Sequence, residues 1–119
     1  MAPIRIVLVE LQGIERDVIR HALGREDGIC VVGDVPSREA LAETLTATRP
    51  DLLIWDLDQV GLPDAGAEAF VEHPRLKILA LERHGTGTLW QLRPHETRLG
   101  ELSPSLLLEA IGRMFGRSS

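Results

Sequence analysis

The stretch Pro50-Asp51-Leu52-Leu53-Ile54-Trp55-Asp56-Leu57-Asp58 decides the fold. Its apolar residues follow one another without polar alternation, between a proline and two acids. A short apolar run of this kind predicts a strand that is buried on both faces, as in the centre of a parallel sheet. Open α/β sheets bind their ligands just beyond the carboxyl ends of such strands, where the strand order reverses. We therefore expect Asp56 to lie at the chemically important edge of a sheet.

The segments on both sides of this strand alternate between strand and helix patterns. Runs of β-branched and aliphatic residues predict further strands over residues 4–9, 29–32 and 76–81. Apolar residues at three- and four-residue spacing predict helices over residues 14–23, 37–50, 64–72 and 103–116. The first helix is expected to bury one stripe, formed by Ile14, Val18, Ile19, Ala22 and Leu23.

The last helix has the strongest signals. Ser103 is a good N-cap, and Pro104 suits the first helical position because its missing N–H would have no partner there. Residues 82–97, in contrast, are the least helix-like part of the chain, since Gly85, Gly87 and the nearby threonines are poor helix formers. We expect an irregular or extended segment there, with a strand over 89–92, a turn at Pro94 and a return over 97–101.

These elements predict one domain over residues 1–119, of the α/β class. Right-handed crossovers then require a flavodoxin-like, doubly wound sandwich with helices on both faces of the sheet. We expect a five-stranded parallel sheet whose fourth helix is reduced or replaced by the irregular or extended segment.

Composition excludes several classes of function. The formal charge is −5, from 13 basic and 18 acidic side chains, and no run of Lys or Arg marks a nucleic-acid surface. No signal-peptide pattern or long apolar run is present, so we expect a cytoplasmic protein without membrane contact. Cys30 is the only cysteine and is expected to be a small buried hydrophobe. The four histidines are scattered and show no metal-ligand spacing.

Three stretches of the chain, residues 4–10, 49–57 and 102–111, resemble the receiver domain of two-component response regulators. The resemblance covers almost the whole chain except residues 83–97. It implies a flavodoxin-like signalling domain in which two acids and a phosphoacceptor Asp bind Mg²⁺, while a Thr or Ser and a Lys receive the phosphoryl group. By this resemblance, Asp56 stands at the phosphoacceptor position and Glu10 at the first acid position.

The other three positions depart from the family pattern. The second acid position falls on Leu11, the hydroxyl position on Glu82 and the lysine position on Gly100. Glu82 would repel an incoming phosphoryl oxygen. These substitutions argue against conventional phosphorylation of Asp56.

Glu10, Asp56 and Asp58 are expected to form an acidic pocket without an obvious cation. Unit charges about 4 Å apart at an effective dielectric near 20 repel by roughly 4 kcal/mol. Glu10 and Asp56 are the candidates for a weak Mg²⁺ or Ca²⁺ site, but we favour a solvated pocket and expect no cofactor.

Three apolar side chains are candidates for contacts with other proteins. Trp90 lies in the polar segment, where it either folds back over the sheet edge, which we favour, or contacts a partner. Leu106, Leu107 and Leu108 are consecutive, so they cannot all face the core; Leu107 is expected to point inward. Leu106 with Phe115 could form an apolar strip for dimerisation or docking. Trp55 is interpreted as core filling.

The favoured reading is an atypical receiver domain that acts through protein–protein interaction, independently of phosphorylation, and is not an enzyme. Its partner would be a second copy, a kinase or an output domain, in a two-component pathway. One alternative is a working receiver that uses Asp56 with an unusual metal site. Another is a flavodoxin-like domain that binds a nucleotide or metabolite; it ranks last, because Leu11-Gln12-Gly13-Ile14 is no glycine-rich phosphate cradle.

Overall fold

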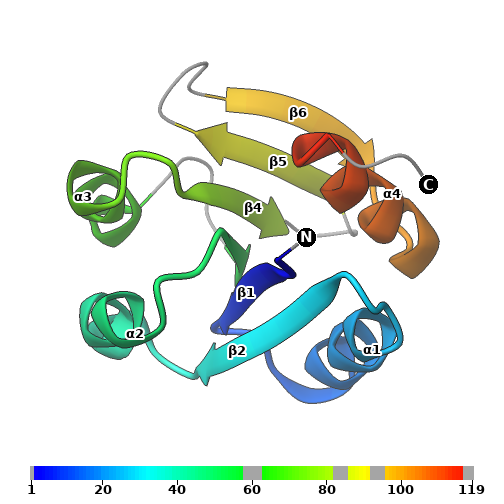
Figure 1. Ribbon diagram of the computed structural model, residues 1–119, viewed down its shortest axis with the longest axis horizontal. Helices are drawn as coiled ribbons and strands as arrows, with labels where there is room; N and C mark the ends of the chain where they lie inside the picture. Colours follow the sequence, from blue (N-terminus) through cyan, green and yellow to red (C-terminus); the bar gives the residue numbers. More distant parts are fainter. Residues whose placement is uncertain (1, 58–62, 82–85, 92–95, 117–119) are drawn as a thin grey trace.

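The computed structural model describes residues 2–57, 63–81, 86–91 and 96–116. Figure 1 shows a twisted sheet between two layers of helices, with α1 and α4 on one face and α2 and α3 on the other. In chain order the elements are β1 (Ile4–Val9), α1 (Gly13–Gly24), β2 (Ile29–Val35), the 3₁₀ turn η1 (Arg38–Ala40), α2 (Leu41–Thr48), β3 (Leu52–Asp56), α3 (Asp64–Glu72), β4 (Lys77–Leu81), β5 (Thr86–Gln91), β6 (Glu96–Glu101) and α4 (Pro104–Met114).

The α/β class and the sandwich of helices around a sheet are confirmed. The described sheet has six strands in the order β2-β1-β3-β4-β5-β6, and the pairings among β2, β1, β3 and β4 are parallel. The pairings β4–β5 and β5–β6 are antiparallel. The sheet is therefore mixed, with one strand more than the five parallel strands expected.

The additional strand comes from the segment that was expected to be extended. Thr88, Leu89 and Trp90 of β5 lie opposite Ala80, Leu79 and Ile78 of β4. A helix over Thr86, Gly87 and Thr88 would be unfavourable, whereas these residues pair well with the exposed edge of β4. The chain reverses direction twice after β4, so β6 runs parallel to β4. It has the direction expected of the fifth parallel strand, but β5 lies between it and β4.

β3 is the buried centre of the sheet, as the opening stretch predicts. All four residues from Leu52 to Trp55 are completely buried. Leu53 and Trp55 pack in one core with α2 and α3, and Leu52 and Ile54 pack in a second core with α1 and α4. Burial on both faces explains why this strand shows no polar alternation.

Two predictions about burial are wrong. Only Ile19 and Leu23 of the α1 stripe are buried, whereas Ile14 is 82% and Val18 is 44% exposed. Successive residues of a helix are turned by about 100°, so the edge of the sheet covers the row of Ile19 and Leu23 but not the neighbouring row. Cys30 is exposed rather than buried, because it lies on the edge strand β2 beside Arg5, which is also exposed.

The last helix begins as predicted. The Ser103 hydroxyl accepts a hydrogen bond from the Leu106 N–H at 3.3 Å, and Pro104 is the first helical residue. Leu107 and Ile111 are buried, while Leu106 is 44% exposed. None of the described helices combines the length and apolar character that crossing a bilayer requires.

Candidate functional site

Glu10 and Asp56 leave neighbouring strands at the same edge of the sheet. β1 pairs with β3 in a register that sets Val9 opposite Trp55, so the next residue of each strand lies at the carboxyl edge. Asp56 is half-buried and lies opposite Leu81 of β4. Asp58 and Glu82, the other two acids assigned to this edge, lie outside the described residues.

The backbone turns sharply at Glu10. Its φ of 58° is in the left-handed region, which few residues other than glycine adopt, and its N–H donates to the Val35 carbonyl at 2.8 Å. This turn ends β1 and starts the connection to α1. The turn places the Glu10 side chain against the end of β3.

The Glu10 carboxylate is bound by two side chains from other elements. The Trp55 Nε1–H donates to Oε1 at 2.6 Å. Arg38 donates to the same oxygen through its terminal nitrogen at 2.9 Å and to Oε2 through Nε at 3.3 Å. The Arg38 guanidinium carbon also lies 5.5 Å from the centroid of the Trp55 ring, within the range of a cation–π contact. We call Glu10, Arg38 and Trp55 the Glu10 cluster.

These contacts keep Glu10 ionised. Burial raises the pKa of this carboxyl group, but the hydrogen bonds from Arg38 and Trp55 and the charge of Arg38 outweigh it, so that the pKa lies below its ordinary value. The side chain of Glu10 is 21% exposed and that of Arg38 is 39% exposed. The pair is therefore only partly screened by water.

Arg38 is the residue that the sequence interpretation missed. We expected acids at this edge without a cation, whereas Arg38 pairs with Glu10 directly. The Ser37 hydroxyl accepts a hydrogen bond from the Glu39 N–H at 3.3 Å and fixes the turn that carries Arg38. The available signal was topological: β2 lies beside β1, so a cation shortly after β2 falls next to the acid that follows β1. Trp55 does fill the core, and its indole N–H in addition binds Glu10.

The described residues at this edge do not fit the Mg²⁺ site that the receiver resemblance implies. Mg²⁺ needs free carboxylate oxygens in near-octahedral geometry. Both oxygens of Glu10 already accept hydrogen bonds, and Leu11, at the second acid position, is 2% exposed and packs in the core beneath α1. Among the described residues, no three His, Cys, Asp or Glu side chains gather as metal ligands would.

Gly100, at the lysine position, is separated from Asp56 by two intervening strands. Asp56, Leu81, Gly87 and Gly100 form one row across β3, β4, β5 and β6. Neighbouring strands are about 4.8 Å apart, so this row spans roughly 14 Å, compared with roughly 10 Å if β6 were the direct neighbour of β4. Because β5 lies between β4 and β6, a side chain at position 100 would be out of reach of Asp56 whatever residue stood there.

The three candidate contact residues lie in different surroundings. Trp90 is half-buried and packs against the core on the side of α2 and α3. Leu106 lines a groove of about 330 Å³ between α4 and the β5–β6 hairpin. Phe115 is half-buried, and the Lys77 ammonium lies over its ring at 4.4 Å while donating to the Met114 carbonyl. Leu106 and Phe115 therefore have different neighbours rather than one shared strip.

Several solved structures of response-regulator receivers are similar to this chain. A structure of RcsB from Salmonella typhimurium (the S207C crossed form) aligns with 100% of this chain and 62% of its own, with a TM-score of 0.67 and 16% identity. The isolated receiver domain of RcsB from Salmonella enterica serovar Typhimurium, in the presence of BeF₃⁻, aligns over 67% of this chain and 62% of its own (TM-score 0.57, 24% identity).

The receiver domain of the putative response regulator NarL from Mycobacterium tuberculosis aligns over 95% of this chain and 79% of its own (TM-score 0.60, 17% identity). The chain spans between 44% and 62% of the length of the RcsB chains it matches. No protein-family model and no curated protein sequence matches it. The strand order of the parallel part, the two helical layers and these structural similarities lead to one conclusion: this chain has the fold of response-regulator receiver domains.

Proposed function

We propose that this chain is an atypical response-regulator receiver domain that signals through protein–protein contacts without depending on phosphorylation of Asp56. The single observation that carries the proposal is the Glu10 cluster. Both oxygens of the carboxylate at the metal position are bound to Arg38 and Trp55. In this arrangement the Arg38 guanidinium supplies the positive charge that a divalent cation would otherwise provide.

The charge balance of the carboxyl edge supports this proposal. A phosphoryl group adds negative charge, which a receiver offsets with a metal ion and a lysine. Here the cation beside Glu10, Arg38, is already paired with its carboxylate. The lysine position is a glycine on a strand that lies one position further out.

The output of such a domain is a surface that another protein recognises. RcsB is named as a regulator studied for DNA interaction. For this chain the composition favours protein partners, because the net charge is −5 and the sequence contains no run of basic residues. A kinase, an output domain and a second copy are the partners to test.

The Trp55 indole N–H provides a direct probe of the site. In ¹H–¹⁵N spectra we expect its signal, which reports the bond to Glu10, to stay unchanged when MgCl₂ and beryllofluoride are added. The Trp90 indole, remote from Glu10 on β5, serves as the internal control. Intact-mass measurement after incubation with acetyl phosphate should show no phosphorylated protein.

One result would contradict the proposal: a saturable, Mg²⁺-dependent shift of the Trp55 signal that disappears in Asp56→Asn. That outcome would favour a working phosphoacceptor with an unusual metal site. Arg38→Met is the matched variant, because it removes the Arg38 hydrogen bonds and charge from Glu10 while keeping an apolar chain over Trp55. Metal binding that appears only in Arg38→Met would show that Arg38 is what excludes the ion.

A further inference from the structure

A groove of about 370 Å³ lies between α2 and α3, on the face of the sheet opposite α1 and α4. Figure 1 shows these two helices side by side on that face. The floor of the groove is apolar and is made by two buried leucines and three alanines, namely Leu41, Ala42, Leu45, Ala65 and Ala69. Because the alanine side chains are short, another element can approach the backbones of both helices closely.

The helices of this face carry most of the net negative charge of the chain. η1, α2 and α3 together have five acidic side chains and one arginine, a net charge of −4, compared with −5 for the whole chain. The five acids are Glu39, Glu43, Asp64, Glu68 and Glu72. α1 and α4, in contrast, each have as many Arg as Asp and Glu side chains. The two helical layers therefore differ in charge, and the layer of α2 and α3 is the acidic one.

The acids that line the α2–α3 groove have no cation of their own. Glu39, Glu68 and Glu72 line it, and none of them takes part in an ion pair within the part of the chain that the structure describes. Arg38 lines the groove as well, but its charge is already paired with Glu10. Three carboxylates thus stand around an apolar floor without compensating charge.

Two further arginines lie near this face but outside the groove. Arg49 and Arg75 follow α2 and α3 and line a separate hollow of about 520 Å³ at the amino ends of β3 and β4. Glu72 borders both hollows, yet among the described residues neither arginine is within ion-pair distance of it. The positive charge at that end leaves Glu39 and Glu68 uncompensated.

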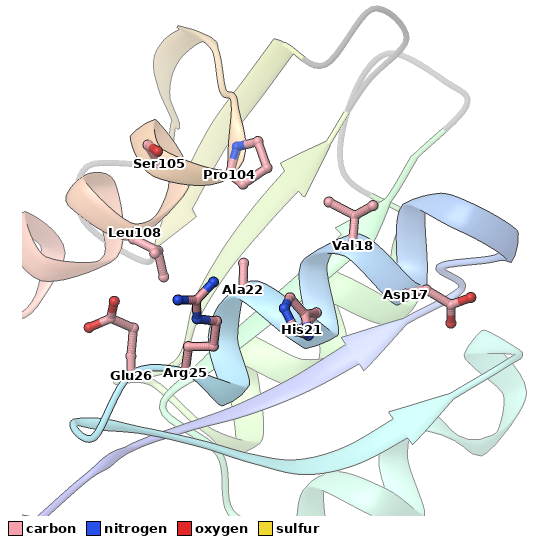
Figure 2. A pocket seen from close by; sticks show the side chains of 9 residues that line it. All are labelled: Asp17, Val18, His21, Ala22, Arg25, Glu26, Pro104, Ser105 and Leu108. Atoms are coloured by element: carbon pink, nitrogen blue, oxygen red, sulfur yellow. The ribbon is translucent and has the colours of Figure 1, made fainter.

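The larger groove on the other face, between α1 and α4, has no such preference. It measures about 790 Å³, and Figure 2 shows Asp17 at one end and Arg25 and Glu26 together at the other. Charges of both signs line it, so they favour neither a basic nor an acidic partner. The α2–α3 groove is the one whose charge selects an occupant.

The spacing of the acids matches a helix that carries basic side chains. Glu68 and Glu72 are one turn apart on α3, so their carboxylates follow the groove at the spacing that Lys or Arg residues have at i and i+4 of a helix. A cavity of about 150 Å³ already holds a benzene ring, so this groove has room for apolar side chains from the same helix. We propose that the α2–α3 groove docks a basic amphipathic helix of a partner protein. The inference rests on the proposed function, to which it adds the chemistry of the partner.

Other classes of occupant fit the charges less well. Nucleic acids and anionic membrane surfaces are attracted by basic side chains and are repelled by these carboxylates. A second copy of the chain would offer helices that are either acidic or without net charge. A helix with an excess of Lys and Arg is complementary to the groove.

Arg38 connects the groove with the Glu10 cluster. Its side chain lines the groove, its guanidinium donates to Glu10, and its guanidinium carbon lies 5.5 Å from the Trp55 ring centroid. A helix that packs against Arg38 therefore changes the surroundings of Trp55. The Trp55 indole signal reports occupation of the groove from inside the domain.

A peptide titration followed in ¹H–¹⁵N spectra of the whole chain tests the proposal. The probe is an amphipathic helix of about 18 residues, about 27 Å long, with leucine on one face and lysine on the other. We expect saturable shifts of the amides of α2 and α3 and of the Trp55 indole, with no response from α1 and α4. The same peptide with glutamate in place of lysine should not bind.

Two pairs of variants separate docking in the groove from general attraction between opposite charges. Ala42→Trp fills the groove and should weaken binding of the lysine peptide at least about tenfold, whereas Ala47→Trp, exposed on α2 outside the groove, should not. Glu68→Lys should weaken binding severalfold more than Glu109→Lys, which changes the net charge equally but lies on α4. All four positions except the partly lining Ala42 are remote from the core, and circular dichroism checks that every variant is folded.

Several results would overturn the proposal. These are a lysine peptide that does not bind saturably, shifts centred on α1 or α4, and equal effects within either pair of variants. Self-association of the chain alone that Ala42→Trp abolishes, measured by sedimentation equilibrium, would make a second copy the occupant instead. Absent peptide binding with a Trp55 signal that ignores Mg²⁺ and beryllofluoride would refute only the docking site. A Mg²⁺-dependent Trp55 shift with intact peptide binding would refute only the proposed independence from phosphorylation.

Discussion

Replacing Arg38 with methionine is the most direct test of the Glu10 cluster. The variant removes two hydrogen bonds to the Glu10 carboxylate, at 2.9 and 3.3 Å, and the cation over the Trp55 ring. It keeps a flexible apolar chain of similar length. The expected result is a loss of stability, because Glu10 remains a partly buried carboxylate with the Trp55 N–H as its remaining partner from the cluster.

The size of the expected stability loss follows from the exposure of Arg38 and Glu10. A hydrogen bond to a charged partner contributes about 1.5–3 kcal/mol when buried and an exposed ion pair only about 0.2–1 kcal/mol. Arg38 is 39% and Glu10 is 21% exposed, so the pair lies between these limits. The cation–π contact adds about 0.5–1 kcal/mol. We expect the free energy of unfolding to fall by about 2 kcal/mol in total.

Urea denaturation, followed by tryptophan fluorescence, measures this loss. With a slope of about 2 kcal/mol per molar urea, the midpoint should fall by roughly 1 M. Arg20→Met is the matched control: Arg20 pairs with Asp34 at 3.1 Å but is 53% exposed, so its loss should stay below about 0.5 kcal/mol. Equal losses for Arg38→Met and Arg20→Met would refute the idea that the Glu10 cluster is a distinct, partly desolvated site.

Three further predictions address pH, packing and capping. The folded-state pKa of Glu10 is lowered from 4.5, so the stability that ionised Glu10 contributes is complete above pH 4.5 and is lost as the pH falls through the folded pKa. The difference in unfolding free energy between wild type and Glu10→Gln should therefore be present at neutral pH and disappear in acid. A difference that stays the same at both pH values would contradict this prediction. Gly87→Ala would place a Cβ 2.3 Å from Leu102 Cδ1 and should cost about 1–3 kcal/mol in urea unfolding, whereas Gly24→Ala, where a Cβ meets open space, should cost nothing. Ser103→Ala removes the side-chain cap of α4 and should lower thermal stability by about 1 kcal/mol, with the exposed and non-capping Ser105→Ala as the neutral comparison.

The elements and their burial were predictable where the sequence pattern is local. The continuous apolar run before Asp56 identified β3 as a strand with two buried faces, and the Ser103-Pro104 pair identified the start of α4. The helix-poor segment was correctly expected to be extended. The pairing of β5 with β4 and β6 was not predicted. Whether a strand adds to the edge of β4 depends on contacts between residues that are distant in sequence.

The candidate site was predictable in part. The parallel order of β1 and β3 implied that Glu10 and Asp56 share one edge, and the register of Val9 with Trp55 agrees with this. The identity of Glu10's partners was not predicted, because Arg38 and Trp55 are 28 and 45 residues away in sequence and no spacing rule links them. The exposure of Val18 was also missed, since a helical repeat marks an apolar side but not how much of it the sheet covers.

The sequence by itself determined the α/β alternation and the buried central strand, because these depend on residue types and on periodicity along the chain. It also shows Leu11 and Gly100 where the receiver resemblance implies an acid and a lysine. Only the tertiary structure decided that Arg38 neutralises Glu10 and that β5 separates β6 from β4. It also decided that α1 presents an uncovered apolar row beside α4. The physical reason is the same in each case: the pairing of charges, the order of strands and the covering of a helix face are set by which elements become neighbours in space.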